Sequence, residues 1–199
     1  MTEPIANPFV VLIDTAEGQP FTFQGLKADA DRNYSPLVVP RISTSLGRYP
    51  NSLGDYSVEG LYGRVHVERK SMEDAWSTIL GWETEYEGSR GLVGHRARFE
   101  SELENLANIE AGVVVVEATI DQCLDLMPAR GKKTVDENRK IFFRSLISFQ
   151  QRFRVNWAWL SSRRAAEVYT FRWMERFWEK LPAKERKAII KAREEQIPF

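Results

Sequence analysis

The chain has 199 residues, 43% of them hydrophobic, which supports one packed core and excludes a disordered or fibrous protein. Its 28 basic and 28 acidic residues give a formal net charge of zero, which argues against non-specific coating of DNA. One cysteine excludes an intrachain disulfide framework and a cysteine-based zinc site. There is no secretory signal and no apolar segment long enough to span a bilayer, so we expect a soluble, cytoplasmic protein without a membrane partner.

The first part of the chain predicts short β-strands. They are expected at 9–14, at 37–44, and in a hairpin formed by 55–59 and 62–69. Pro40 lacks an amide hydrogen, so it confines its strand to a sheet edge or to a bulge. In the hairpin, Val65 and Val67 alternate with polar residues, so we expect the valines to face a core. Glu68 and Lys70 then face a cleft.

The rest of the chain alternates between helices and strands. Capping residues and apolar periodicity predict helices at 71–80, 95–110, 119–126, 134–152, 161–180 and 182–195. Two apolar runs between them, 113–116 and 155–160, predict buried strands. The segment 81–94 is rich in glycine and charge, which predicts a long surface loop or lid. This alternation predicts an α/β domain with a mixed sheet.

Asp55, Glu68 and Lys70 carry the strongest functional signal. Residues i and i+2 of a strand point to the same face, so Glu68 and Lys70 project side by side and Asp55 reaches them from the other strand of the hairpin. Carboxylates of this kind hold Mg²⁺ while water and phosphate fill its remaining positions. In phosphodiester hydrolysis, a cation stabilises the charge on the phosphate and an ammonium group can orient the attacking water. The alternative is that Asp55 is an ordinary turn aspartate after Gly54.

The residues around these three resemble a known family. Residues 54–56 (Gly-Asp-Tyr) followed by 67–74 (Val-Glu-Arg-Lys-Ser-x-x-Asp) resemble the signature of XPF-type structure-specific endonucleases. These enzymes form the Glu-Arg-Lys-x-x-x-Asp branch of the PD-(D/E)xK superfamily. The upstream residues 11–17 resemble the family's hydrophobic-Asp-x-Arg-Glu element, in which Ala16 replaces the usual Arg. Later segments resemble the family's next helix, core strand, and closing strand with its helix: 98–102, 113–117 and 153–180.

The resemblance covers about residues 9–180 and implies a restriction-endonuclease-like, three-layer α/β domain with a central mixed β-sheet flanked by helices. Residues 181–199 then form a C-terminal helical extension. Larger relatives carry tandem helix-hairpin-helix modules, which grip duplex DNA and aid dimerisation, and this chain is too short for a full pair. We therefore expect a short form whose extra grip on DNA comes from the nuclease domain, a homodimer or a partner nuclease subunit.

The activity that the resemblance implies is cleavage of DNA with Mg²⁺ or Mn²⁺. Asp55 and Glu68 are the expected metal ligands, together with Asp14. Lys70 is expected to position the attacking water or to stabilise charge on the phosphate. Asp14 and the nearby Glu17 either help the metal site or simply end their strand.

Two further residues of the catalytic motif, Arg69 and Asp74, are expected to hold the strand and the following helix in place. Asp74 fits the capping pattern that begins at Ser71, so it caps the helix and is also open to an ion pair with Arg69. Glu117 follows four valines and is either a site residue or a solvent-facing acid at the end of its strand.

Several basic residues are candidates for contacts with DNA phosphates. They are Arg96 and Arg98 after the 81–94 segment, and Lys132, Lys133 and Arg139 in a basic cluster at 132–154. Each either contacts phosphates or lies on a solvated helix face. The aromatic side chains of the 161–180 helix pack against a core, the terminal helix or a second subunit, with base stacking as the alternative.

The sequence therefore predicts a Mg²⁺-dependent endodeoxyribonuclease that hydrolyses phosphodiester bonds without a covalent intermediate. The resemblance implies a preference for flap, fork or junction DNA in DNA repair or recombination, and association with the nucleoid in a bacterial cell. The alternative is a catalytically silent DNA-binding or scaffolding subunit that pairs with an active nuclease. Silent relatives usually lose one of the acids or the lysine, and this chain has all three, which favours catalysis.

Overall fold

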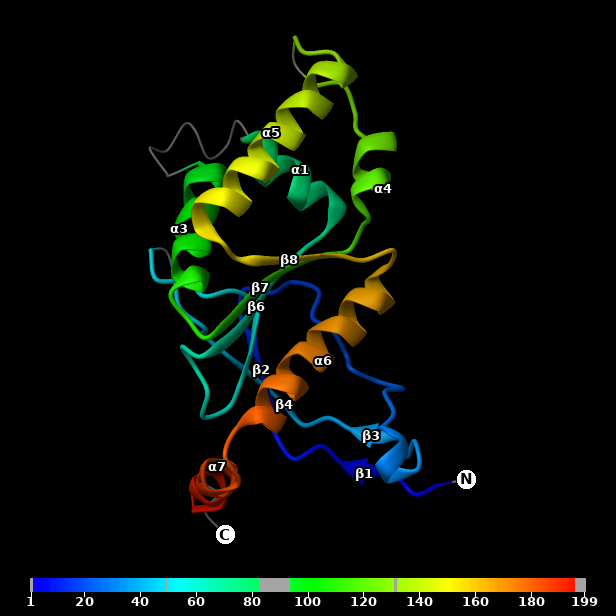
Figure 1. Ribbon diagram of the computed structural model, residues 1–199, viewed down its shortest axis with the longest axis vertical. Coiled ribbons are helices and arrows are strands. Elements are labelled where there is room, and N and C mark those ends of the chain that lie inside the picture. Colours follow the sequence, from blue (N-terminus) through cyan, green and yellow to red (C-terminus); the bar gives the residue numbers. More distant parts are fainter. Residues whose placement is uncertain (1, 49, 83–93, 131, 196–199) are drawn as a thin grey trace.

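A mixed β-sheet runs through the middle of the molecule (Figure 1). The computed structural model describes residues 2–48, 50–82, 94–130 and 132–195. Six strands within these ranges form the sheet. The spatial order of its strands is β4 (Arg41–Thr44), β2 (Val11–Asp14), β5 (Tyr56–Val58), β6 (Val65–Lys70), β7 (Ala111–Val116) and β8 (Asn156–Trp159). Strand β5 is antiparallel to both of its neighbours, and the other pairings are parallel.

Helices cover both faces of the sheet, which gives three layers (Figure 1). One face packs against α1 (Met72–Leu80), α3 (His95–Ala107), α4 (Ile120–Asp125) and α5 (Val135–Phe153). The other face packs against α6 (Arg163–Lys180). The expected three-layer α/β architecture with a mixed central sheet is therefore confirmed. The predicted loop or lid at 81–94 lies outside the described residues at positions 83–93.

Strand β7 explains why both faces need helices. Val113 and Val115 belong to the apolar cluster under α6, whereas Val114 and Val116 belong to the cluster under the other helices. All four side chains are fully buried. A run of β-branched residues without polar alternation is typical of a parallel strand that is covered on both faces. Burial of each valine stabilises the fold by about 1.5–3 kcal/mol.

The hairpin of β5 and β6 begins at a turn that requires glycine. Gly54 has a φ of +107°, in the region that residues with a side chain rarely adopt. A Cβ at this position would lie 2.9 Å from the carbonyl oxygen of Val67 and 3.0 Å from the amide nitrogen of Glu68. The backbone of Gly54 therefore approaches β6 more closely than a side chain allows. This approach brings Asp55 against β6, where its amide donates to the Val67 carbonyl at 2.9 Å.

Two predicted strands differ from the structure at their ends. The predicted strand 37–44 is broken at Pro40 into β3 (Leu37–Val38), which pairs with β1 (Ile5–Ala6) in a separate sheet, and the edge strand β4. The edge position agrees with the missing amide hydrogen of Pro40. The predicted buried strand 155–160 is wrong in its burial. Strand β8 is the opposite edge of the sheet, so it lacks a second neighbour, and its Asn156 is exposed.

Several helices begin at the capping residues that the sequence predicts. The side-chain oxygens of Ser71, Thr119 and Thr134 each accept a hydrogen bond from a backbone amide in the first turn of the helix that follows. A short 3₁₀ helix, η1 (Ala30–Arg32), lies in the N-terminal part.

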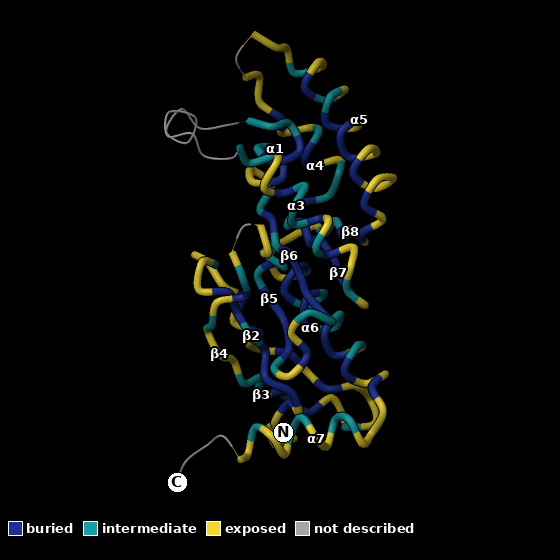
Figure 2. Tube along the Cα trace, turned by 90° about the vertical axis from the view of Figure 1, so that its left-hand side faces the viewer, coloured by how far each residue is buried: buried dark blue, intermediate teal, exposed yellow. Residues whose placement is uncertain are grey.

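The last helix, α7 (Ala183–Glu195), lies across the end of the sheet opposite α5 (Figure 1), and none of its residues is buried (Figure 2). Its Ile189 and Ile190 nevertheless pack against the apolar cluster under α6. The boundary between residues 180 and 181 stays a prediction. None of the described helices is long and apolar enough to cross a membrane.

The Gly54 turn yields a stability prediction. Gly54→Ala should lower the free energy of unfolding by about 2 kcal/mol or more, because it combines a left-handed backbone with a clash against β6. Gly18→Ala is the matched control, since no atom lies within 4 Å of a Cβ built there. Urea unfolding of both variants measures the difference. Equal stability of the two would contradict the proposed close approach.

Candidate active site

A cavity of about 530 Å³ lies where β2 ends, β5 begins and α3 passes over β6. Four carboxylates and two guanidinium groups line it: Asp14, Asp55, Glu68, Glu102, Arg48 and Arg98. Strands β2 and β6 and the two residues before β5 contribute to its lining. The Asp14 amide donates to the Asp55 carbonyl oxygen at 2.8 Å, and Asp55 is bound in turn to β6. The sheet therefore brings together acids that lie far apart in the sequence.

Asp55 is held by the main chain of β6. Its Oδ2 accepts a hydrogen bond of 2.7 Å from the amide of Arg69. Burial raises the pKa of Asp55 well above its usual value, the negative charge of Glu68 adds to this rise, and the bond from Arg69 opposes it. The cavity therefore contains acidic groups whose charges repel each other when no cation is bound.

Glu68 and Lys70 project from the same face of β6, opposite to Val65 and Val67, as the alternation predicts. Lys70 Nζ donates to Glu68 Oε1 at 2.8 Å and lies 4.3 Å from the ring centre of Phe99. Burial opposes the charge of Lys70, but the negative charge of Glu68 and its neighbours outweighs it and raises the pKa of Lys70 above its usual range. The lysine therefore stays an ammonium ion.

Glu102 was not predicted as a site residue. It projects from α3 into the cavity, and its pKa is raised to about 7 by burial and by the negative charge of Glu68. The positive charges of Lys70 and Arg98 and a hydrogen bond with Ser52 oppose this rise. A signal was present in the sequence, because Arg98 and Glu102 are four residues apart and so share one side of a helix. Only the packing of α3 on β6 shows that this side faces the cavity.

Asp14 lies at the rim of the same cavity, but both of its carboxylate oxygens already accept backbone hydrogen bonds. Oδ1 accepts from the amide of Ala16 and Oδ2 from the amide of Leu46, each at 2.7 Å. These bonds connect the end of β2 to the segment after β4. Its role as a metal ligand stays a prediction.

Arg69 projects from the other face of β6, under α6, and forms a buried ion-pair network. Its guanidinium group donates to Glu117 at 2.7 Å and to Glu17 at 3.1 Å. Arg163 of α6 also binds Glu117, at 2.9 Å, and both guanidinium groups lie over the ring of Phe21. The network fixes β6 and the end of β7 from the face of the sheet that packs against α6. Glu17 therefore pairs with Arg69 and does not line the cavity, and its support of the site stays a prediction.

The ion pair between Arg69 and Asp74, which the sequence left open as a second role for Asp74, does not form, because Arg69 pairs with Glu17 and Glu117. Asp74 is exposed on α1, and its carboxylate accepts from the Ser71 hydroxyl at 2.8 Å. Its amide donates to the same hydroxyl at 3.1 Å. Helix α1 packs on the face of the sheet that Glu68 and Lys70 occupy, whereas the side chain of Arg69 points to the opposite face. The pleat of β6 therefore separates the two residues, and Asp74 instead binds Ser71, the N-cap of α1.

The predicted DNA-contacting residues do not form one surface. Arg98 lines the cavity. Arg96 instead joins three helices, because its guanidinium group binds Glu100 at 3.2 Å, the Ser145 hydroxyl at 3.3 Å and the Ile79 carbonyl oxygen at 3.4 Å. The other candidates lie at the N-terminal end of α5 and do not line the cavity: Lys132, Lys133 and Arg139. Their contact with DNA stays a prediction.

The donor set of the cavity fits a hard divalent cation. Carboxylate oxygens without thiolate or imidazole neighbours suit Mg²⁺ or Mn²⁺. Among the residues that the structure describes, no three or more His, Cys, Asp or Glu side chains form a group that could hold a metal ion. Mg²⁺ normally binds through one or two carboxylates and keeps several waters, so Asp55 and Glu68 could hold one such ion. A cation between them would relieve the repulsion that raises the pKa of Asp55.

The ion-pair network yields a prediction. Glu117→Gln should lower the free energy of unfolding by about 2 kcal/mol, because it leaves the buried Arg69 without one of its two charged partners. Glu179→Gln is the control, since Glu179 pairs with the exposed Arg176 and such surface pairs contribute about 0–1 kcal/mol. Chemical unfolding compares the two variants. A loss as small for Glu117→Gln as for Glu179→Gln would show that the network does not stabilise the fold.

Glu102 yields a pH-dependent prediction. Its pKa is raised from 4.5 to about 7 in the folded chain, so the contribution of Glu102 to stability becomes less favourable as pH rises from about 4.5 to about 7. Glu102→Gln should therefore match the wild type at pH 4.5 and exceed its free energy of unfolding by roughly 1–3 kcal/mol at pH 8. Thermal and urea unfolding across this range measure the gap. The exposed Glu104→Gln is the control, and a gap independent of pH would contradict the assignment.

Comparisons with known proteins agree with this architecture. No protein-family model and no curated protein sequence matches the chain. XPF from Aeropyrum pernix in complex with DNA aligns with a TM-score of 0.53 at 14% identity, over 88% of this chain and 69% of that one. A second structure of XPF from Aeropyrum pernix aligns with a TM-score of 0.52 at 15% identity, over 86% and 66% of the two chains. At this identity the likeness is one of fold, and the fold of this chain is that of XPF, as the motif at 54–74 predicts.

Proposed function

We propose that this chain is a Mg²⁺- or Mn²⁺-dependent DNA endonuclease that hydrolyses phosphodiester bonds without a covalent intermediate. The observation that carries the proposal is that Asp55 and Glu68 line one cavity and that Lys70 Nζ lies 2.8 Å from Glu68 Oε1. The XPF-like fold supports it, because one of the similar structures is a complex with DNA.

In this mechanism, Asp55 and Glu68 would hold the cation. Bound there, a divalent cation would supply positive charge for the scissile phosphate and lower the pKa of the attacking water. The Arg69 amide keeps one oxygen of Asp55 in place, which leaves the other oxygen for the cation. Glu68 is kept in place by Lys70.

Lys70 contributes an electrostatic function. Its raised pKa keeps the ammonium charged at neutral pH, so it does not act as a general base. The ammonium donates hydrogen bonds that orient the attacking water and stabilise charge on the phosphate. Arg98, at the edge of the cavity, is the nearest candidate for a contact with a neighbouring DNA phosphate.

The remaining residues of the motif position these groups. Arg69 holds β6 through Glu17 and Glu117, and Asp14 holds the segment after β4. Asp74 holds the side chain of Ser71, which caps the helix that follows Lys70. Flap, fork or junction DNA is the proposed substrate, and DNA repair or recombination the proposed setting. The chain acts as a homodimer or with a partner subunit.

Cleavage by three variants tests the proposal. Asp55→Asn, Glu68→Gln and Lys70→Met should each lower the rate of DNA cleavage by at least ~100-fold, because each removes a group that acts on the reacting phosphate. Lys187→Met, an exposed change on α7 outside the candidate DNA-contacting residues, is the control and should cut at the wild-type rate. Labelled linear, flap, fork and junction DNAs are incubated with Mg²⁺, with Mn²⁺ or with EDTA. Undiminished cutting by any of the three variants would contradict the mechanism.

A binding measurement separates catalysis from scaffolding. Mg²⁺ should raise the melting temperature of the wild type and raise it less in Asp55→Asn and Glu68→Gln, because the cation stabilises the state that binds it. A wild-type chain that binds DNA but cuts none of the substrates at any metal concentration would instead identify a silent scaffolding subunit.

A further inference from the structure

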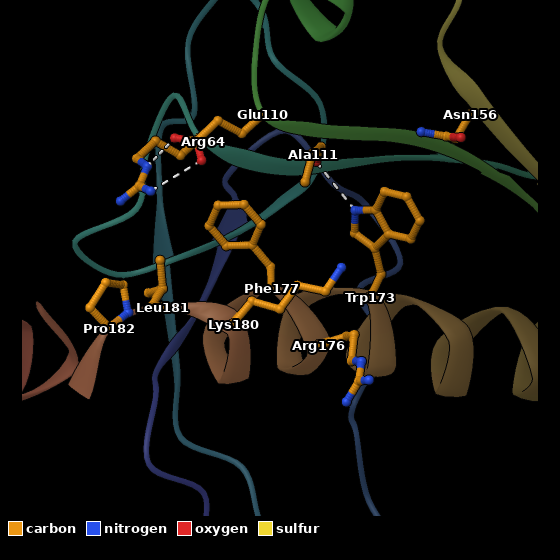
Figure 3. Close-up of a pocket in the computed structure, with 10 residues that line it drawn as sticks. All are labelled: Arg64, Glu110, Ala111, Asn156, Trp173, Arg176, Phe177, Lys180, Leu181 and Pro182. Carbon is orange, nitrogen blue, oxygen red and sulfur yellow. Dashed lines mark hydrogen bonds and ion pairs between the residues drawn. The ribbon is translucent and has the colours of Figure 1, made fainter.

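A second cavity, of about 430 Å³, lies at the other end of the sheet from the candidate active site. Its lining includes the first residues of two parallel strands, Ala111 of β7 and Asn156 of β8, and Arg64 immediately before β6. The opposite wall is the C-terminal part of α6 (Figure 3). Along β6, Arg64 and Glu68 lie roughly 13 Å apart at ~3.3 Å per residue, so the two cavities are separate.

Two aromatic rings from α6 form one wall of this second cavity. Trp173 and Phe177 are one helical turn apart and both line it. Trp173 is fixed in place, because its Nε1 donates to the Ala111 carbonyl oxygen at 3.2 Å and its ring stacks on Tyr169 with centres 6.1 Å apart. Arg64 lies 5.5 Å from the centre of the Phe177 ring. Figure 3 shows Phe177 between Arg64 and Trp173.

The cavity has an excess of positive charge. Its lining has three basic residues and one acid, which leaves a net charge of two: Arg64, Arg176, Lys180 and Glu110. Arg64 is neutralised by ion pairs with Glu110 and Glu185. Lys180 has no side-chain partner among the described residues, and its ammonium points between the two aromatic rings (Figure 3). The side chain of Arg176 is 74% exposed, and within the described part of the chain it pairs at the surface with Glu179, at 3.1 Å.

We propose that this cavity binds one nucleotide unit, with its base against Trp173 and Phe177 and its phosphate at Lys180 and Arg176. Every base offers a π-face to an aromatic ring, and ammonium and guanidinium groups are the usual partners of phosphate. The Asn156 amide donates to the Gly112 carbonyl oxygen at 3.4 Å, and its own oxygen accepts no hydrogen bond from the described residues. That oxygen is available to a base edge.

The cavity has a volume in the range of small-molecule sites. The choice of a nucleotide over another aromatic anion rests on the proposed function. A free mononucleotide and an unpaired nucleotide of a DNA strand share the same chemistry, and binding competition distinguishes them. A nucleotide bound at this site lies away from the cleavage chemistry, so the site would hold a strand and not cut it.

Binding of fluorescein-labelled dT10, measured by anisotropy in EDTA so that no strand is cut, tests the proposal. Lys180→Ala and Phe177→Leu should each weaken the affinity about tenfold, as expected for the loss of one phosphate contact or one stacked base. Lys187→Ala on α7 is the matched control, because it removes an exposed lysine that does not line the cavity. Thermal unfolding checks that each variant is folded. Wild-type affinity in Lys180→Ala, a surface change, would overturn the proposal.

Competition identifies the ligand. Displacement of dT10 by dTMP indicates a site for free nucleotides, and displacement only by unlabelled oligonucleotide indicates a site for a strand; both support the proposal. Displacement by inorganic phosphate as effectively as by dTMP would overturn it, because the base would then contribute nothing. Cleavage with Mg²⁺ is assayed separately. If the protein binds dT10 through Lys180 but never cuts DNA, only the proposed nuclease activity is rejected. If it cuts DNA but binds dT10 without Lys180, only this nucleotide site is rejected.

Discussion

The hydrogen bond from the Arg69 amide to the Asp55 carboxylate connects the two strands on which the site depends. It forms only because Gly54 lets the chain approach β6 more closely than a side chain permits. The same strand then sends Glu68 and Lys70 to one face and the Arg69 side chain to the other. Three consecutive residues of β6 thereby have different roles. Glu68 places a carboxylate and Lys70 an ammonium group on one face, and Arg69 connects the strand to the layer on the other face.

The charges on the two faces of β6 differ, because one face has a balanced ion-pair network and the other has an excess of carboxylates. Under α6, the charges of Arg69 and Arg163 balance those of Glu17 and Glu117, so this buried network is satisfied. In the cavity, by contrast, several carboxylates share a partly buried space, and the pKa values of Asp55 and Glu102 are raised. Repulsion of this kind costs stability, and it provides an environment in which a divalent cation is favoured. The balanced network therefore supports a strand whose other face is left with excess negative charge.

Much of the local structure could be predicted from the sequence. The capping residues Ser71, Thr119 and Thr134 locate helix starts because their side chains satisfy amides of the first turn. The four valines of β7 indicate a strand covered on both faces, and the alternation in 65–70 indicates which side chains share a face. These features depend on residues that are close together in the sequence, so the sequence pattern is sufficient to predict them.

The sequence by itself determined the strand alternation, the Gly54 turn and the acid–lysine pair at 68 and 70, because each depends on backbone geometry within a few residues. Only the tertiary structure decided that Glu102 faces the cavity and that Arg69 pairs with Glu117 instead of Asp74. It also made β8 an edge strand and formed the cavity between Trp173 and the strand ends. These outcomes depend on which face of a helix packs against which strand, and residues far apart in the sequence set that packing.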